Sequence, residues 1–179
     1  MSLWSPDLFQ NAFRFASEAH CGQTLPGSKV PYITHVAIVC AELMAVVDDS
    51  MDADLALQCA ALHDVVEDTD ISYEVIKREF GTPVADGVSS LSKDPCISKE
   101  HRLEESLARI MTQPREIWMV KLADRITNLA PPPASWSDNK KRQYRDQAII
   151  IHERLGEANP ELADRLMAKI ENYRNYISR

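Results

Sequence analysis

Apolar side chains recur along most of the chain at the three- and four-residue spacing of amphipathic helices. No segment shows the strict alternation of a half-buried strand, so we predict an all-α fold of about eight to ten helices. Ser5 and Thr82 each precede a proline, which is typical of a helix N-terminus. The expected helices cover residues 6–21, 34–47, 52–66, 72–80, 82–91, 99–112, 114–129, 138–155 and 160–178.

The helix expected over 52–66 contains the most apolar stretch of the chain, LALQCAALHDVV, which predicts a central helix buried nearly all round. Residues 22–31 hold two glycines and two prolines and are predicted to form a loop. The tract PPPASW at 131–136 is followed by too few residues for an independent core. We therefore expect one domain over residues 1–179, with a motif core at about 13–144 and C-terminal helices of 138–178 packed on it.

Composition narrows the class of protein. The chain is 45% apolar and carries a formal net charge of −7, which argues against general nucleic-acid binding because that needs a basic face. The negative net charge is still compatible with an anionic substrate, since a bound cation can reverse the local electrostatic field in a cleft. Neither a membrane-spanning apolar run nor a secretory signal is present, so we expect a cytoplasmic protein without membrane attachment.

The four cysteines are far apart and form no CxxC pair, so we interpret them as reduced thiols and not as zinc ligands. Cys40 and Cys59 have apolar neighbours and are predicted to lie in the core, where free cysteine packs like a small hydrophobe.

The densest polar cluster, HDVVED at residues 63–68, follows the most apolar helix directly. Buried imidazoles and carboxylates need partners, and a metal ion supplies several at once. Helical spacing places His63 and Glu67 on one face, and likewise Asp64 and Asp68. The HD dipeptide alone is short and common, so by itself this cluster is more typical of a solvated helix end than of a metal site.

Two further positions favour a metal site. His35 lies just inside an expected helix start, and Asp124 lies on a largely apolar helical face, where a lone carboxylate would be unfavourable. With His63 and Asp64 they form a set of two imidazoles and two carboxylates. Such a set suits Mn²⁺, Fe²⁺, Zn²⁺ or Mg²⁺ and leaves positions open for water and substrate, so we predict one divalent cation here.

These residues carry a family resemblance. The pattern H…HD…D is that of the HD phosphohydrolase superfamily, and HDVVEDT followed by VKLADRITNL resembles its RelA/SpoT alarmone-hydrolase branch, including the stand-alone metazoan SpoT homologues. The resemblance implies a metal-dependent hydrolase that removes the 3′-pyrophosphate of (p)ppGpp and releases pyrophosphate, usually with Mn²⁺. It implies a catalytic pair, which here is Glu67 and Asp68. It also implies four metal ligands, which here are His35, His63, Asp64 and Asp124.

The resemblance also implies contacts with the nucleotide substrate. Asn128 matches the asparagine of the DRxxN motif, which helps hold the nucleotide, and Lys140 and Tyr144 match a basic residue and a tyrosine that meet the phosphates. Charge alone adds candidates, because Lys and Arg form charge-assisted bonds with a polyanion. These candidate phosphate contacts, each of which could instead be a solvated surface charge, are Lys93, Lys121, Arg125 and Lys140.

One tyrosine and three histidines receive neither a catalytic nor a metal-binding role. Tyr32 is interpreted as packing or as a wall of the pocket. The remaining histidines lack ligand-like company and are interpreted as ordinary residues: His20, His101 and His152.

The loop after the first helix departs from the family pattern. Relatives commonly carry an Arg-Lys pair after the glutamine, with the arginine against the guanine base, whereas Gln23 is followed here by Thr24 and Leu25. Thr24 is therefore our candidate beside the base, and guanine preference is left open. A second hypothesis is an HD hydrolase of another nucleotide, such as the adenine alarmone (p)ppApp or a nucleoside monophosphate.

A third hypothesis, from another class, is an inactive HD module that binds a nucleotide or a protein partner. The complete ligand set and the Glu-Asp pair weigh against it. A two-metal cyclic-dinucleotide phosphodiesterase is disfavoured because further histidines at bridging spacing are missing. The sequence is compatible with a homodimer and does not decide the oligomeric state.

Overall fold

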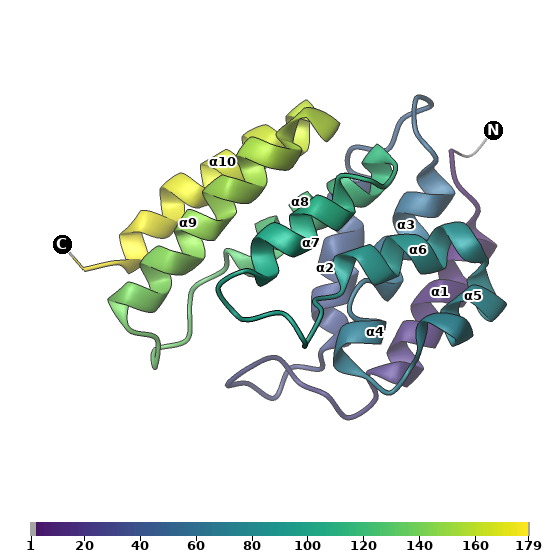
Figure 1. The fold of residues 1–179 in the computed structure, drawn as a ribbon, viewed down its shortest axis with the longest axis horizontal. Helices are drawn as coiled ribbons and strands as arrows, with labels where there is room; N and C mark the ends of the chain where they lie inside the picture. The colour runs from purple at the N-terminus through teal and green to yellow at the C-terminus, as the bar shows by residue number, and fades with distance from the viewer. Residues whose placement is uncertain (1–2, 179) are drawn as a thin grey trace.

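The computed structural model describes residues 3–178, and over these residues its regular structure is helical throughout, which confirms the predicted all-α fold (Figure 1). The α-helices are α1 (Pro6–Ala19), α2 (Ile33–Met44), α3 (Ala53–Leu62), α4 (Val65–Asp68), α5 (Tyr73–Phe80), α6 (Thr82–Leu91), α7 (Arg102–Ile110), α8 (Arg115–Asn128), α9 (Asp138–Leu155) and α10 (Pro160–Tyr173). Two single-turn 3₁₀ helices, η1 (Gly156–Ala158) and η2 (Arg174–Tyr176), follow α9 and α10.

Local capping explains several of these boundaries. The Ser5 side chain accepts a hydrogen bond from the Leu8 amide at the start of α1, and the Ser137 and Asn159 side chains cap α9 and α10 in the same way. The bounds of α6 and α9 agree with the prediction. The helices α2 and α7 are shorter than predicted, and the last predicted helix is divided between α10 and η2.

The predicted helix over 52–66 is wrong in one respect that concerns the HD motif. The helix α3 ends at Leu62, and His63 and Asp64 form a junction before the short helix α4. His63 Nδ1 donates a hydrogen bond to the Ala60 carbonyl (2.8 Å). This side-chain bond competes for the carbonyl that the Asp64 amide would use in a continuous helix. His63 and Glu67 therefore do not lie on one uninterrupted helical face.

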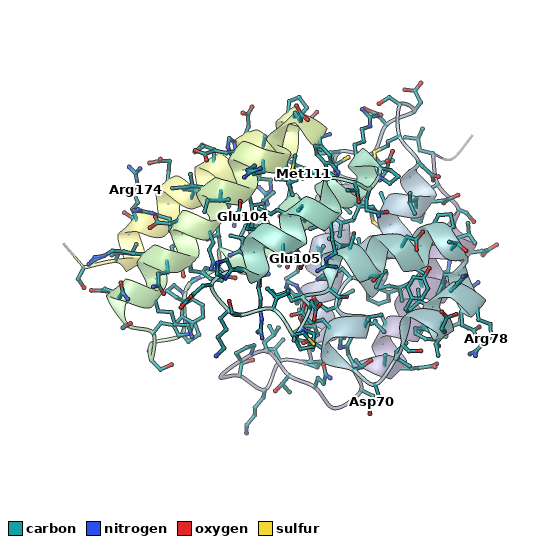
Figure 2. The ribbon with its side chains drawn as sticks, viewed as in Figure 1. Asp70, Arg78, Glu104, Glu105, Met111 and Arg174 are labelled. Carbon is teal, nitrogen blue, oxygen red and sulfur yellow. The ribbon has the colours of Figure 1, made fainter. Side chains whose placement is uncertain are left out.

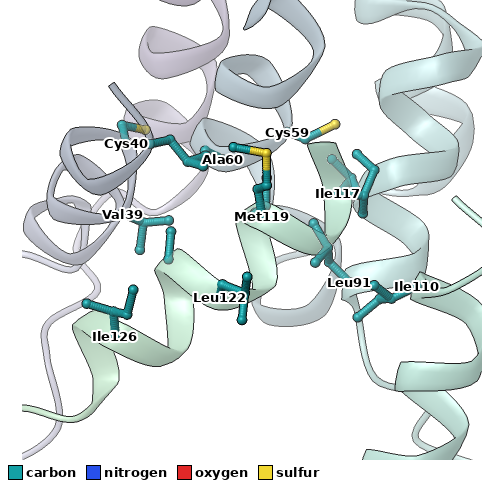
Figure 3. Close-up of a cluster of buried hydrophobic side chains, with 14 of the residues drawn as sticks. Val39, Cys40, Cys59, Ala60, Leu91, Ile110, Ile117, Met119, Leu122 and Ile126 are labelled. Carbon is teal, nitrogen blue, oxygen red and sulfur yellow. The ribbon is translucent and has the colours of Figure 1, made fainter. Parts of the chain in front are cut away.

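The core lies where α8 packs against α2, α3 and α6 (Figure 3). The helix α3 is buried along most of its length, as its apolar sequence predicts. Cys40 and Cys59 are buried in this core, whereas Cys21 and Cys96 are exposed, and all four are free thiols. Among residues 3–178, none of the helices combines the length and apolar character that a bilayer crossing requires.

The C-terminal helices α9 and α10 lie side by side and pack on α8, so α8 is covered on two sides (Figure 1). The proline-containing segment 129–137 leads from the end of α8 to the start of α9. This path brings the first two turns of α9 next to the C-terminal half of α8, as the contact between Tyr144 and Arg125 shows.

Candidate functional site

Two imidazoles and a carboxylate meet where α2 and the junction between α3 and α4 converge. The Nε2 atoms of His35 and His63 are 3.3 Å apart, and Asp64 Oδ2 lies 2.8 Å from His63 Nε2 and 3.7 Å from His35 Nε2. These three potential ligand atoms all lie within 4.8 Å of one another. Asp124 of α8 adds an oxygen, Oδ1, at 3.4 Å from His35 Nε2 and 3.9 Å from His63 Nε2. The structure thus brings together the four residues that the sequence predicts as ligands.

The hydrogen bonds of this cluster suit a cation. Because His63 Nδ1 donates to the Ala60 carbonyl, the lone pair of the neutral ring is on Nε2, which faces His35. Two facing imidazole nitrogens beside two carboxylates require a proton or a metal ion between them. Burial alone lowers the pKa of His63, but Asp64 and Asp124 raise it overall to about 9. The donor set and its attraction for positive charge therefore fit a divalent metal ion.

Neighbouring side chains hold both carboxylates in place. Burial raises the pKa of Asp64 and of Asp124, but His63 beside the former and Lys121 beside the latter bring both well below their usual range. The Tyr32 hydroxyl donates to Asp64 Oδ2 (2.5 Å). Both carboxylates are therefore ionised and held in a fixed orientation.

Two residues predicted as substrate contacts, Lys121 and Asn128, form hydrogen bonds with Asp124. Lys121 is buried and its Nζ donates to Asp124 Oδ2 (3.0 Å), and Asn128 Nδ2 donates to Asp124 Oδ1. Lys121 lies one turn before Asp124 on α8 and Asn128 one turn after it, so both reach its carboxylate. In the structure these two side chains orient the carboxylate.

Glu67 and Asp68, the predicted catalytic pair, have different surroundings on α4. Glu67 accepts hydrogen bonds from the amide and the Nζ of Lys93 (2.9 and 2.6 Å), so the predicted phosphate contact Lys93 is paired with a carboxylate. Asp68 reaches solvent in an open cavity of about 660 Å³ that Glu67 and Gln23 also line. Partial burial raises the pKa of Asp68, as do the charges of Asp64 and Glu67. A higher pKa makes the Asp68 carboxylate a stronger base than an ordinary aspartate.

Four side chains form a stack beside Asp124, in which two aromatic rings lie between two cationic groups. In order along the stack they are Arg125, Tyr144, Trp136 and Lys140. The Arg125 guanidinium lies 4.5 Å from the Tyr144 ring centre, Tyr144 meets Trp136 edge to face at 5.1 Å, and Lys140 Nζ lies 4.2 Å from the Trp136 ring centre. Arg125 is buried, yet its Nε and Nη1 have no hydrogen-bond partner. Because buried donors are nearly always paired, this guanidinium is suited to an anionic ligand.

Three residues that lie beside the site, Tyr32, His20 and Gln23, form hydrogen bonds there that the sequence did not predict. Tyr32 bonds to Asp64, and its ring contacts that of His20 at 4.9 Å between centres. Gln23 links His20 to the backbone of Asp68. Thr24, the candidate base contact, is exposed next to Gln23 in the loop between α1 and α2. Tyr32 lies three residues before His35, so this spacing could have placed Tyr32 beside the site. The contacts of Gln23 depend on the conformation of its loop, which could not be read from the sequence.

The family model and the curated relatives that match this chain agree with one another. Residues 12–160 match the family model described as HD domain. The curated relative named "Guanosine-3′,5′-bis(diphosphate) 3′-pyrophosphohydrolase MESH1" from Xenopus tropicalis is 30% identical over 167 residues, which cover 89% of this chain and 90% of that protein. Its counterpart from Danio rerio is 28% identical and covers 93% of this chain and 94% of the relative.

A guanosine-3′,5′-bis(diphosphate) 3′-pyrophosphohydrolase from Vibrio cholerae is 34% identical over 160 residues, but this chain spans only 22% of that longer protein. A solved structure described as a metazoan ortholog of SpoT that hydrolyzes ppGpp superposes with a TM-score of 0.83 at 26% identity, and the match covers 97% of this chain and 98% of that one.

Proposed function

Because the chain belongs to the HD-domain family and to its RelA/SpoT-like branch, we propose that it removes the 3′-pyrophosphate of a (p)ppGpp-like alarmone and releases pyrophosphate. The observation that carries this proposal is the cluster of His35, His63, Asp64 and Asp124, in which the two Nε2 atoms face each other at 3.3 Å. The names of the relatives supply the substrate class.

We propose Mn²⁺ as the cation, held by the two imidazoles and the two carboxylates. When bound, it supplies Lewis-acid polarisation of the phosphoryl oxygen and a lowered pKa for the attacking water. Tyr32, Lys121 and Asn128 keep the carboxylates oriented through their hydrogen bonds.

The chain's own acid–base groups then handle the protons. Water attacks the phosphorus bound to the ribose 3′ oxygen, the bond between that phosphorus and the 3′ oxygen breaks, and pyrophosphate is released. The attacking water loses a proton, and the 3′ oxygen gains one. Asp68, with its raised pKa and its access to the open cavity, is the group suited to exchange these protons. Glu67, fixed by Lys93, orients the water or the leaving oxygen.

Replacing Arg125 by methionine should weaken substrate binding. The guanidinium has two unpaired donors beside the ligand cluster, and charge-assisted hydrogen bonds contribute about 1.5–3 kcal/mol, so KM for the alarmone should rise roughly tenfold to a hundredfold while kcat changes less. Steady-state kinetics measure this. The matched control is Arg78→Met, the same charge change at an exposed arginine on α5 (Figure 2), which should leave KM unchanged. An unaltered KM in Arg125→Met would remove Arg125 from the substrate site.

Base preference should be weak or should favour adenine. Threonine and leucine offer no guanidinium plane to stack on a purine or to donate to guanine O6 and N7, and such contacts contribute about 1–3 kcal/mol each. We therefore expect kcat/KM for ppApp to equal or exceed that for ppGpp, and Thr24→Arg to shift the ratio toward guanine. Thr24 is exposed, so the substitution should be tolerated. A wild-type preference of about a hundredfold for ppGpp would mean that other residues read the base.

A substrate panel tests the proposed function. The purified protein is incubated with Mn²⁺ and ppGpp, ppApp, nucleoside monophosphates or cyclic nucleotides, and the products are identified. Release of pyrophosphate from a 3′-substituted nucleotide is the expected result. Orthophosphate from nucleoside monophosphates would support the second hypothesis, and the absence of any product would favour the binding module.

A further inference from the structure

Buried side-chain nitrogens without a hydrogen-bond partner occur, among residues 3–178, on two residues, Arg125 and His20. His20 caps the C-terminus of α1, is only 3% exposed, and leaves its Nε2 unpaired. An unpaired buried acceptor destabilises a fold, so stability does not account for an imidazole at this position.

Gln23 fixes which nitrogen of His20 carries the proton. The Gln23 Nε2 donates to the backbone carbonyl of Asp68 (2.8 Å), which turns the amide oxygen of Gln23 toward His20. That oxygen lies 2.8 Å from His20 Nδ1. Since a carbonyl oxygen only accepts, Nδ1 must donate, and the lone pair of the neutral ring is on Nε2.

His20 is thereby connected to two parts of the candidate site. Through Gln23 it holds the backbone of Asp68 at the end of α4. Its ring also packs on Tyr32, whose hydroxyl donates to Asp64.

We propose that His20 is a positioning residue: its Nδ1–H, acting through Gln23, sets the backbone of Asp68, and its ring sets the orientation of the Tyr32 hydroxyl against Asp64. The effect on turnover rests on the proposed function, whereas the hydrogen-bond arrangement does not. His20 makes no contact with substrate in this proposal.

Two substitutions separate positioning from packing. His20→Phe keeps a ring against Tyr32 and removes the donor to Gln23, whereas His20→Asn can place an amide nitrogen where Nδ1 was. We expect His20→Phe to lower kcat on the order of tenfold with KM nearly unchanged, and His20→Asn to restore most of it. Equal activity of His20→Phe and wild type, or a change in KM alone, would overturn the proposal.

A double-mutant cycle tests the route through Gln23. If His20 acts through this amide, the double variant His20→Phe, Gln23→Met should lose no more kcat than Gln23→Met alone, because Gln23 makes the bond to Asp68. Additive losses would mean that the two residues act independently and would contradict the proposed route. Melting temperature and Mn²⁺ affinity of every variant serve as controls for global damage.

Two readouts do not depend on activity. Nitrogen NMR of the imidazoles should find His20 as the Nδ1–H tautomer, and hydrogen exchange of the Asp68 amide, which bonds to the Asp64 carbonyl, should accelerate in His20→Phe but not in His20→Asn. An Nε2–H tautomer or unchanged exchange would overturn the inference whatever the substrate. A wild-type protein that releases no pyrophosphate from any alarmone would refute the proposed function, while these two readouts would still decide the role of His20.

Discussion

Asp64→Ala and His63→Ala are each expected to lose the bound cation and the hydrolytic activity together. Each substitution removes one of four converging side chains, and Asp64→Ala also leaves the Tyr32 hydroxyl without its acceptor. A catalytic cation contributes several kcal/mol of transition-state stabilisation, so kcat/KM should fall on the order of 10³-fold or more. Metal content by mass spectrometry and kcat/KM with added Mn²⁺ measure the two losses side by side.

The control for these variants is Asp164→Ala, which removes an exposed carboxylate on α10. It makes the same change in charge as Asp64→Ala and should retain both metal and activity. Full metal occupancy in Asp64→Ala and His63→Ala would contradict the ligand assignment, whatever happened to the rate.

Asp68→Asn and Glu67→Gln should have the second-largest effect, with the metal retained. Neither carboxylate belongs to the tight ligand cluster, and the amides preserve shape while removing the ability to exchange a proton. Kcat should fall by about 10²-fold or more, the usual contribution of a positioned acid or base. Kinetics on protein with measured metal content provide the test. Unchanged kcat with a raised KM would make both of them binding residues.

Lys93→Met provides a matched comparison for Glu67. In the structure, Lys93 Nζ donates its hydrogen bond to the Glu67 carboxylate. The backbone amide of Lys93 also donates to this carboxylate, and that bond remains when the lysine side chain is replaced. Lys93→Met should therefore lower kcat less than Glu67→Gln does. A larger loss in Lys93→Met would indicate that the ammonium itself meets the substrate.

Helical spacing was sufficient to predict the fold class and most helices, because amphipathic periodicity reports which face is buried. It was insufficient at the HD motif, where α3 ends at Leu62. The break depends on a side-chain bond from His63 to the Ala60 carbonyl, and a periodic pattern carries no information about such competition.

The candidate site was predicted in part for similar reasons. Four distant ligand positions could be proposed because buried imidazoles and carboxylates need a shared partner. Lys121 and Asn128 were assigned to substrate from charge and motif, although their spacing from Asp124 on one helix already placed them beside its carboxylate. The link from His20 through Gln23 to Asp68 depends on the path of a loop, which the residue types alone do not determine.

Hydrolysis in water enriched in ¹⁸O shows which phosphorus–oxygen bond the protein breaks. The proposed reaction is attack of water on the phosphorus joined to the ribose 3′ oxygen, with the protons handled by Asp68 and Glu67. Mass spectrometry of the products of the Mn²⁺-loaded wild-type protein should therefore find one ¹⁸O atom in pyrophosphate and none in the nucleotide. Labelled orthophosphate, or label incorporated into the nucleotide, would show that water attacks elsewhere and would rule out the proposed reaction.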